Sequence, residues 1–471
     1  MSIRQRLDFA ATVHSIKAVP RWKVDRVRAV QDRRLRRLLK AARESSPFYQ
    51  RRLAGLDLDR VALCDLPTVT KEELRDQWDN VVTDRSLKLS RVEEFLADEA
   101  NLGRWFQNQY AVCHTSGSLG RPLVIVQDRL CLNVIFAMLA ARCSLDGPPG
   151  VLEAIRRWLR PKKVAAISFR RGPYPSGMLL EFMQDILGRF VDVRRFSSVQ
   201  SDLADRLEEF NPDSITGYAS VLEALATSAT PPRLPRLRQL TNSSEQLSDR
   251  ARERIERAFS ARILDHYGTG ECLQLADGCP HCGHLHVNDD WAILESVDEQ
   301  NRPVPPGVTG DKILVTNLAN RVQPFIRYEV ADRVSLAAEP CSSRHLTRIQ
   351  SIEGRSVEVF WVETSSGRRF LPGILFHSSI DAVGLVRDWQ AIQRGPSRIE
   401  VRLLPLREHC HEPAHVSGCV RDSLARNGFP ADIQLDIDTV TQLSPNPRTG
   451  KMQRILVEIE DFRRGSPIAH G

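Results

Sequence analysis

LSDRARERIERAFSARILDHYGTGE, residues 247–271, has the pattern of a helix, a short strand and a glycine turn in direct succession. Leu247, Ala251, Ile255 and Phe259 recur every four residues, which is the spacing of one apolar face of a helix. The segment ARILDHYG follows and ends in glycine, as a short buried strand does. This succession is typical of an α/β protein, in which ligands bind beyond the carboxyl ends of the strands.

The same alternation extends over most of the chain. Strand-like segments such as LVIVQD and DKILVTNL stand among helix-like segments such as CLNVIFAMLAARCSL and SVLEALATSA. Near residue 350 the pattern changes to short strands and turns with one further helix. We therefore expect a large α/β domain with several subdomains over residues 1–352 and a small α+β domain over residues 353–471.

The composition is that of a globular protein. The chain has 471 residues, of which 42% are hydrophobic, which is enough to form more than one core. No segment approaches the roughly 20 consecutive apolar residues that cross a bilayer, and the N-terminus has no apolar run of signal-peptide length. We therefore expect a cytoplasmic protein that has no membrane contact.

The formal net charge of +7 owes much to arginine, with a dense run in residues 25–44, DRVRAVQDRRLRRLLKAARE. Such a run could attract nucleic acid. Its apolar residues follow helical spacing, however, so we expect its arginines on the solvated face of an amphipathic helix. Nucleic-acid binding is the weaker interpretation.

Residues 114–128, HTSGSLGRPLVIVQD, place a loop of small residues before a strand. Hydroxyl groups can bind an anion, and glycines let the backbone approach it closely. The loop lacks the Lys-Ser or Lys-Thr ending of the common phosphate-binding loop, so taken alone it is equally compatible with an ordinary turn. Its hydroxyls and glycines are at Thr115, Ser116, Gly117, Ser118 and Gly120.

This loop is one of several short segments that follow one another in a characteristic order. The order is SPFYQRRL, TSGSLGRP, NSSEQL, YGTGE, TNLANRVQPFIRYEVADR, IEGR and NPRTGKMQR. The series resembles the adenylate-forming superfamily of acyl-CoA synthetases, luciferases and adenylation domains. It is most similar to the branch that contains phenylacetate-CoA ligases and capsule-associated adenylating proteins. The resemblance covers nearly the whole chain.

The resemblance implies a ligase that activates a small carboxylic acid with ATP and Mg²⁺, releases pyrophosphate and transfers the acyl group to coenzyme A. It also implies the adenylate-forming fold, with a mobile small domain that rotates between the two half-reactions. Transfer to an amine or to a carrier-protein thiol stays open, as does a homodimer. The alternative from another class is a zinc-dependent nucleic-acid-binding protein, which would release no pyrophosphate.

The resemblance also implies a set of nucleotide-binding residues. Tyr267 would lie against the adenine, Asp332 would accept hydrogen bonds from the ribose hydroxyls, and Arg355 would lie near the phosphates. Arg121 stands where the family usually has lysine. The implied nucleotide-binding residues are Thr115, Ser116, Gly117, Ser118, Gly120, Arg121, Ser243, Ser244, Glu245, Tyr267, Gly268, Asp332 and Arg355.

Three residues are implied to be catalytic. Glu271 would bind Mg²⁺, which prefers carboxylate and phosphate oxygens. The family usually has threonine or serine directly before this glutamate, whereas this chain has Gly270, so Thr269 is the candidate for the missing hydroxyl. Lys451 would bridge the attacking carboxylate and the α-phosphate. For the pivot of the domain rotation, Glu358 is only a candidate.

The segment CLQLADGCPHCGHLH is rich in possible metal ligands. Cys272, Cys279 and Cys282, with His284 or His286, could form a tetrahedral zinc site, because thiolates and imidazole favour Zn²⁺. The resemblance favours His286 and a structural zinc. Reduced cysteines near loop-capping histidines are the alternative, and a zinc hydrolase would need an open coordination position and a general base.

Overall fold

The segment that joins a helix to a strand folds as predicted. In the computed structural model of the chain, α12 spans Asp249–Phe259 and β7 spans Arg262–Tyr267. The hydroxyl of Ser248 caps the helix by accepting a hydrogen bond from the backbone N–H three residues along. Ser260 has a left-handed backbone conformation (φ 48°) and ends the helix. The buried face of α12 comprises Ala251, Ile255 and Phe259.

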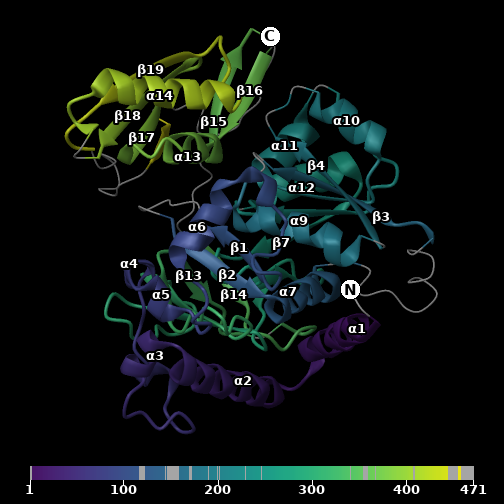
Figure 1. Cartoon of the computed structure of the whole chain (residues 1–471). Coiled ribbons are helices and arrows are strands. Elements are labelled where there is room, and N and C mark those ends of the chain that lie inside the picture. The colour runs from purple at the N-terminus through teal and green to yellow at the C-terminus, as the bar shows by residue number, and fades with distance from the viewer. Residues whose placement is uncertain are drawn as a thin grey trace. The chain divides into compact units, whose positions relative to one another are not determined.

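The chain divides into two units by its internal contacts, and Figure 1 shows their elements. Unit 1 comprises residues 1–115, 123–196 and 204–355, and unit 2 comprises residues 116–122, 197–203 and 356–471. The residues that the structure describes are 3–115, 122–143, 145, 159–168, 172–188, 190–198, 200, 202–228, 230–245, 247–339, 341–353, 359–365, 367–406, 409–443 and 454–457.

A seven-stranded sheet is the largest sheet of unit 1, with the strand order β4-β3-β5-β6-β7-β8-β9. Strands β3, β5, β6 and β7 are parallel, and β8 and β9 extend the sheet in antiparallel orientation. Helices stand between successive parallel strands along the chain, which confirms the α/β class. The bounds are β3 (Lys162–Ser168), α9 (Pro175–Leu187), β4 (Val191–Ser197), α10 (Leu203–Phe210), β5 (Ser214–Gly217), α11 (Ala219–Thr227), β6 (Gln239–Ser243), β8 (Ala276–Gly278) and β9 (Leu285–Val287).

Helices make up most of unit 1 before its first strand. The predicted amphipathic helix is α2 (Val24–Ser45), and most of its predicted apolar face is buried. The other helices are α1 (Ile3–Ala18), η1 (Val19–Arg21), α3 (Pro47–Arg52), η2 (Leu63–Asp65), α4 (Lys71–Asp76), α5 (Trp78–Val81), α6 (Leu89–Ala97) and η3 (Glu99–Asn101).

Several arginines of α2 bind neighbouring parts of unit 1, although the sequence predicted a solvated basic face. Arg34 lies over the ring of Trp291 at 3.5 Å and forms an ion pair with Asp290 at 3.5 Å. Arg36 and Arg43 donate hydrogen bonds to backbone carbonyls of the segment that follows α3. These side chains stabilise the packing of α2, which accounts for part of the arginine run.

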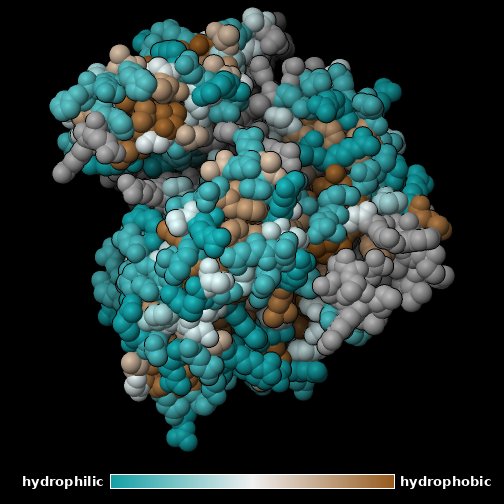
Figure 2. All heavy atoms as spheres, in the orientation of Figure 1, coloured by the Kyte–Doolittle hydropathy of each residue, from teal (hydrophilic) through white to brown (hydrophobic). Residues whose placement is uncertain are grey.

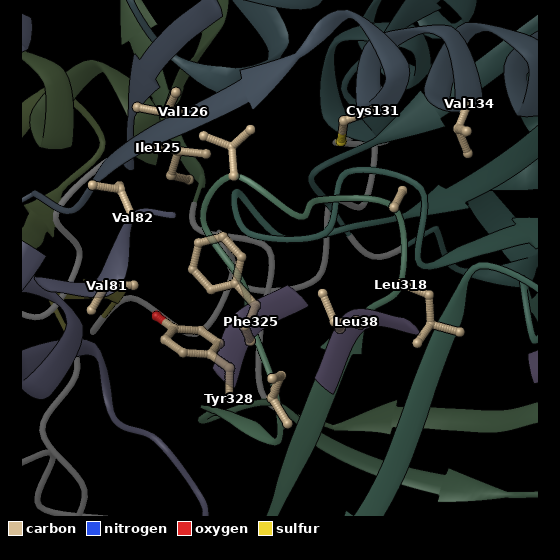
Figure 3. Close-up of a cluster of buried hydrophobic side chains, with 14 of the residues drawn as sticks. Leu38, Val81, Val82, Ile125, Val126, Cys131, Val134, Leu318, Phe325 and Tyr328 are labelled. Atoms are coloured by element: carbon tan, nitrogen blue, oxygen red, sulfur yellow. The ribbon is translucent and has the colours of Figure 1, made fainter. Parts of the chain in front are cut away.

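The largest hydrophobic core of unit 1 is formed by the N-terminal helices, the β1–β2 hairpin and helix α7. Figure 3 shows part of this core, in which the rings of Phe325 and Tyr328 lie edge to face with centroids 5.5 Å apart. The bounds are β1 (Tyr110–His114), β2 (Val124–Asp128) and α7 (Arg129–Arg142).

Two smaller antiparallel sheets complete unit 1. Strands β10, β11 and β12 form one of them, and β13 and β14 form the other. They matter because β11, β12 and the residues after β12 supply side chains to the site described below. The bounds are β10 (Ala292–Val297), β11 (Lys312–Asn317), β12 (Tyr328–Val330), β13 (Arg333–Leu336) and β14 (Ile349–Glu353).

Unit 2 has a four-stranded sheet in the order β19-β18-β17-β20, together with a separate β15–β16 hairpin. Strands β17 and β18 are antiparallel, and each has a parallel neighbour on its other side. Helices α13 and α14 pack against the strands of this sheet. The bounds are β15 (Val359–Thr364), β16 (Gly367–Pro372), α13 (Gly373–Asp381), β17 (Val386–Gly395), β18 (Arg398–Pro405), α14 (Pro413–Arg426), β19 (Gln434–Thr439) and β20 (Ile455–Val457).

Hydrophilic side chains cover most of the face that Figure 2 shows, and hydrophobic side chains gather there in small patches. Among the helices of the described residues, none combines the length and the apolar character that are needed to span a membrane.

Candidate functional site

The turn after β7 carries several of the predicted site residues. The backbone N–H groups of Thr269 and Cys272 donate to each other's carbonyl oxygens, at 3.1 and 3.2 Å. The Thr269 hydroxyl also accepts from the Cys272 N–H at 3.1 Å and is buried. A Cβ atom at Gly268 would lie 2.3 Å from the carbonyl oxygen of Leu273, so the turn requires glycine there. Thr269 therefore stabilises the turn from inside.

The predicted adenine and ribose residues are brought together. The hydroxyl of Tyr267, at the end of β7, donates to Oδ2 of Asp332 at 2.7 Å. Asp332 lies just after β12, 65 residues along the chain, and both side chains are buried. An acceptor carboxylate beside an aromatic ring provides the two chemical features that bind a nucleoside, a diol acceptor and a flat apolar surface.

The predicted Mg²⁺ ligand, Glu271, is buried at 6% exposure. Its Oε1 accepts a hydrogen bond of 2.6 Å from the hydroxyl of Tyr328, and its backbone carbonyl accepts one of 2.8 Å from Nδ2 of Asn317. Burial and the charge of Glu271 raise the pKa of Tyr328 far above its usual range, so this hydroxyl remains a donor. A carboxylate has about four acceptor positions, so the bond from Tyr328 leaves acceptor capacity for a cation.

The two strands of the β1–β2 hairpin are joined by hydrogen bonds next to the small-residue loop. The backbone N–H of Thr115 donates to the carbonyl of Leu123 at 2.9 Å, and the N–H of Leu123 donates to the Thr115 hydroxyl at 3.0 Å. These two bonds close the base of the loop. The remaining predicted residues of the loop lie outside the described residues, and they are Ser116, Gly117, Ser118, Gly120 and Arg121.

Gly270 packs directly against the base of that loop. A Cβ atom there would lie 3.1 Å from Cγ2 of Thr115, 3.3 Å from Cδ1 of Ile125 and 3.4 Å from Cγ of Pro175. These separations are shorter than the roughly 3.5 to 4.0 Å of favourable carbon contacts. A side chain at position 270 would therefore press against the methyl group of Thr115, which is a physical reason for glycine there.

The predicted pocket loop follows β6. Ser243 is the last residue of this strand, and Ser244 has a left-handed backbone conformation, with φ 69°. Asn242 fixes the loop, because its side-chain amide donates to the carbonyl of Glu245 and to Oδ1 of Asp265, both at 2.7 Å. The loop therefore begins at the carboxyl end of β6, beside the end of β7.

Lys451, Arg355 and the pivot candidate Glu358 lie outside the described residues. The strand that follows Lys451 is described, and Arg454 anchors its start within unit 2. The guanidinium of Arg454 forms an ion pair with Asp388 at 2.8 Å, and its backbone carbonyl accepts from β17 at 2.7 Å.

Three of the predicted zinc ligands lie together in unit 1, and Cys341 joins them. The potential ligand atoms of Cys279, Cys282, His286 and Cys341 all lie within 4.8 Å of one another. Sγ of Cys282 is 3.3 Å from Nε2 of His286. A tetrahedral zinc site with bond lengths of about 2.0 to 2.3 Å has ligand atoms roughly 3.3 to 3.8 Å apart, so the four side chains fit this ion.

The surroundings favour a thiolate at Cys279, whereas burial and the charge of Cys279 raise the pKa of Cys282 to about 11. Burial opposes ionisation of Cys279, but hydrogen bonds from the Ser343 hydroxyl and from the backbone N–H groups of Cys282 and His281 outweigh it and lower the pKa of Cys279 to about 7. A thiolate is the form that binds zinc.

The structure places one predicted ligand, Cys272, outside this cluster. Its side chain is buried in a separate hydrophobic cluster with Leu275 and Val287, and burial raises its pKa to about 12. The hydrogen bonds with Thr269 place Cys272 at the corner of the turn, so its side chain faces this core. Of the two candidate histidines, His286 is in the cluster and the exposed His284 is not.

The sequence reasoning missed three contributors to these sites. Asn317 and Tyr328 both lie within the long motif TNLANRVQPFIRYEVADR, but their contacts with Glu271 required knowledge of how β11 and β12 pack. Cys341 stands far along the chain in PCSSRH, without a second cysteine at metal-ligand spacing. The only indication in the sequence that Cys341 could bind a metal was that His345 follows it closely along the chain.

Comparison with known proteins reveals distant relatives over most of the chain, although no family model matches it. A phenylacetate-coenzyme A ligase of Thermus thermophilus is 23% identical over 486 aligned residues, which cover 94% of this chain and 98% of the relative. A phenylacetate-coenzyme A ligase of Escherichia coli is 26% identical and covers 71% of this chain and 72% of the relative. Protein CapK of Staphylococcus aureus is 20% identical, with coverage of 66% and 63%.

Solved structures share the fold. The chain resembles a crystal structure of 2-hydroxyisobutyryl-CoA ligase in complex with 2-HIB-AMP and CoA, with a TM-score of 0.61 and 18% identity. The match covers 95% of this chain and 92% of that one. An open conformation of the same ligase gives a TM-score of 0.53.

Proposed function

Because the chain belongs to the adenylate-forming ligase superfamily, we propose that it joins a carboxylic acid to the AMP part of ATP and then transfers the acyl group to coenzyme A. The fold is the α/β fold of that superfamily. We assign nucleotide and acid binding to residues 1–352, and the lysine that acts in the first half-reaction to residues 353–471.

One observation supports this assignment most strongly. Tyr267 and Glu271 stand on one turn at the carboxyl end of β7, and each is hydrogen-bonded to a residue in or directly after β12, Asp332 and Tyr328 respectively. Gly270, on the same turn, packs against Thr115 at the base of the small-residue loop. A nucleoside acceptor and a carboxylate for a cation therefore lie on one turn, next to Thr115, the residue that precedes the small-residue loop in the chain.

In the proposed site, Tyr267 lies against the adenine and Asp332 binds the ribose hydroxyls. Mg²⁺ would be held by Glu271 and by phosphate oxygens, where it neutralises negative charge. Tyr328 donates to Glu271 and so orients the carboxylate toward the cation. Thr269 keeps the turn closed by accepting the Cys272 N–H, and its hydroxyl still has a hydrogen that it can donate to a phosphate oxygen, so it stays the proposed substitute for the family hydroxyl.

In the first half-reaction, a carboxylate oxygen attacks the α-phosphorus of ATP. A bond forms between these two atoms, the bond from the α-phosphorus to the oxygen that bridges to the β-phosphate breaks, and pyrophosphate leaves. Lys451 is proposed to contact both the attacking oxygen and the α-phosphate, where negative charge accumulates. In the second half-reaction, the thiolate of coenzyme A attacks the acyl carbon and AMP leaves.

The molecule that accepts the acyl group is the part of the proposal with the least support from the residues of the site. Coenzyme A is supported by the distant relation to two phenylacetate-coenzyme A ligases. An amine or a carrier-protein thiol would need the same adenylation step, and only the attacking atom would differ. The nucleic-acid alternative loses support because Arg34, Arg36 and Arg43, which belong to the basic run, are engaged within unit 1.

We also propose a structural zinc ion held by Cys279, Cys282, His286 and Cys341. Three thiolates and one imidazole fill all four positions of a tetrahedral site, so no position remains for a reactive water molecule. This ion would tie the segment after β8 to the loop after β13.

The function is tested with a panel of carboxylic acids, in which pyrophosphate release from ATP is measured with and without coenzyme A. We expect release that depends on one class of acid and, with coenzyme A, formation of its thioester. Lys451→Ala should lose at least about 100-fold in rate while it still binds ATP, because lysine would act mainly on charge that develops during the reaction. Lys451→Arg is the control that retains the charge, and full activity of Lys451→Ala contradicts the assignment.

A further inference from the structure

His266 connects the two ends of the turn that carries Tyr267 and Glu271. It is the residue directly before Tyr267 on β7. Its Nε2 lies 2.8 Å from the carbonyl oxygen of Leu273, and its Nδ1 lies 2.8 Å from Oδ1 of Asp277. The imidazole therefore spans from the strand before the turn to the residue that closes it.

The hydrogen-bond partners of His266 indicate which of its ring nitrogens acts as a donor. A carbonyl oxygen only accepts, so Nε2 must carry a hydrogen. Asp277 is 1% exposed and also accepts hydrogen bonds from the thiol of Cys143 at 2.7 Å and from Nδ2 of Asn288 at 2.9 Å. These contacts hold the carboxyl group of Asp277 beside Nδ1 of His266. Asp277 thus fixes the orientation of the imidazole ring, and Nε2 is its donor to the turn.

The pKa values of the two groups shift in opposite directions. Burial acts to lower the pKa of His266, but the hydrogen bond and the charge of Asp277 outweigh burial and raise it. Burial acts to raise the pKa of Asp277, and the hydrogen bond and charge of His266 overcome this effect and lower it. Each group therefore favours the charged form of the other.

The carbonyl group of Leu273 lies in close contact with the start of the turn. It lies so close to Gly268 that a Cβ atom there would be only 2.3 Å away. The other backbone bonds of the turn, between Thr269 and Cys272, lie inside it. The hydrogen bond from His266 is therefore the side-chain contact that fixes the closing residue to β7.

We infer that His266 is a positioning residue that holds the Tyr267–Glu271 turn in its nucleotide-binding geometry by donating a hydrogen bond to the carbonyl of Leu273, with Asp277 as its anchor. The inference rests on the proposed function, because it assigns the turn to ATP and Mg²⁺. Without this bond the turn can open at Leu273, so Tyr267 and Glu271 would lose their fixed separation.

Two substitutions separate the two bonds of His266. Glutamine places its amide nitrogen near the position of Nε2, so His266→Gln keeps a donor for the carbonyl of Leu273. Asparagine reaches only the position of Nδ1, so His266→Asn keeps the contact with Asp277 and loses the bond to the turn. Ile263→Val, at a buried position on the same strand, is a control for a small loss of packing that leaves the turn unchanged.

The experiment measures ATP affinity by calorimetry and the KM values for ATP and for the acid, all on the full chain. We expect His266→Asn to bind ATP at least tenfold more weakly, which is about 1.4 kcal/mol, with an unchanged KM for the acid. His266→Gln and Ile263→Val should remain within about twofold of the wild type, a difference of about 0.4 kcal/mol. Wild-type affinity in a folded His266→Asn variant overturns the inference.

Further outcomes are equally decisive. If His266→Asn does not fold, His266→Gln decides alone, and a tenfold loss of ATP affinity in that variant contradicts the inference. A second metal ion per chain that is lost in His266→Asn also overturns it, because Cys143, His266 and Asp277 would then be metal ligands. If the wild type binds no ATP, the proposed function fails first, and this result is distinct from equal binding by wild type and variant.

Discussion

Replacement of Gly270 by the threonine that the family usually carries is expected to destabilise this protein. A Cβ atom at position 270 would lie 3.1 Å from Cγ2 of Thr115, with Ile125 and Pro175 only slightly farther away. Gly270 does not have a left-handed backbone conformation, so the lack of space and not the backbone decides the outcome. All three neighbours are side chains and Ile125 is fully buried, so Thr115 and Ile125 must move by a few tenths of an ångström to admit a new Cβ atom.

The expected magnitude follows from overpacking. Insertion of extra carbon atoms into a well-packed region costs about 1 to 3 kcal/mol, and we expect Gly270→Thr to lower the free energy of unfolding by that amount. Thr115→Ser removes the nearest methyl group but keeps the hydroxyl that accepts from Leu123. The double variant should therefore regain at least about 1 kcal/mol relative to the sum of the two single effects.

Urea unfolding of the wild type, the two single variants and the double variant forms a double-mutant cycle that measures this coupling. Equal stability of wild type and Gly270→Thr would refute the packing argument. Strict additivity of the two changes would show that Thr115 is not the group that restricts position 270. Pyrophosphate release by the double variant then measures what a hydroxyl at this position contributes to the reaction.

Three further perturbations have defined outcomes. Tyr328→Phe removes the donor to Glu271 and should raise the activation free energy of the reaction by about 1.5 to 3 kcal/mol. It should also raise the Mg²⁺ concentration that is needed for half-maximal pyrophosphate release. An unchanged Mg²⁺ requirement counts against Glu271 as the ligand. Burial raises the pKa of Asp289 from 3.8 to about 6, so stability is lost as the pH rises from about 4 to about 6, and the full loss is present above pH 6. Asp289→Asn should therefore raise the free energy of unfolding at pH 7.5 by roughly 2 to 3 kcal/mol, and this gain should disappear as the pH falls toward 4. Urea unfolding at several pH values measures the gain. Metal analysis of protein purified without added zinc should find about one zinc per chain. Cys341→Ser should lower this zinc content, whereas Cys272→Ser should leave it unchanged. Wild-type protein that is fully active without zinc would exclude the proposed site.

Much of the fold could be predicted because local patterns and tertiary packing agree. The face of α12 and the glycine that ends β7 follow from residue spacing alone, and the structure confirms both. The arginines of α2 differ, because contacts such as the one between Arg34 and Asp290 join segments more than 250 residues apart. Spacing identifies which face of a helix is apolar, but it does not identify the partners of the polar face.

In the candidate site, too, the local sequence identified residues but not all of their partners. The pattern YGTGE placed Tyr267 and Glu271 on one turn, and the order of motifs associated them with Asp332. The bond from Tyr328 to Glu271 depends on the packing of β12 against that turn, which local sequence does not encode. Cys341 escaped prediction for the same reason, since it comes close to the other ligands only when the loop after β13 reaches the segment after β8.

The central claim is that this chain forms an acyl-adenylate, and exchange of labelled pyrophosphate into ATP tests this most directly. Exchange requires the attack of a carboxylate on ATP and its reversal, and it does not depend on the identity of the acyl acceptor. The account predicts exchange that requires both Mg²⁺ and an added carboxylic acid and that is lost in Lys451→Ala. Absence of exchange with a broad panel of acids, in wild-type protein that binds ATP, would contradict it.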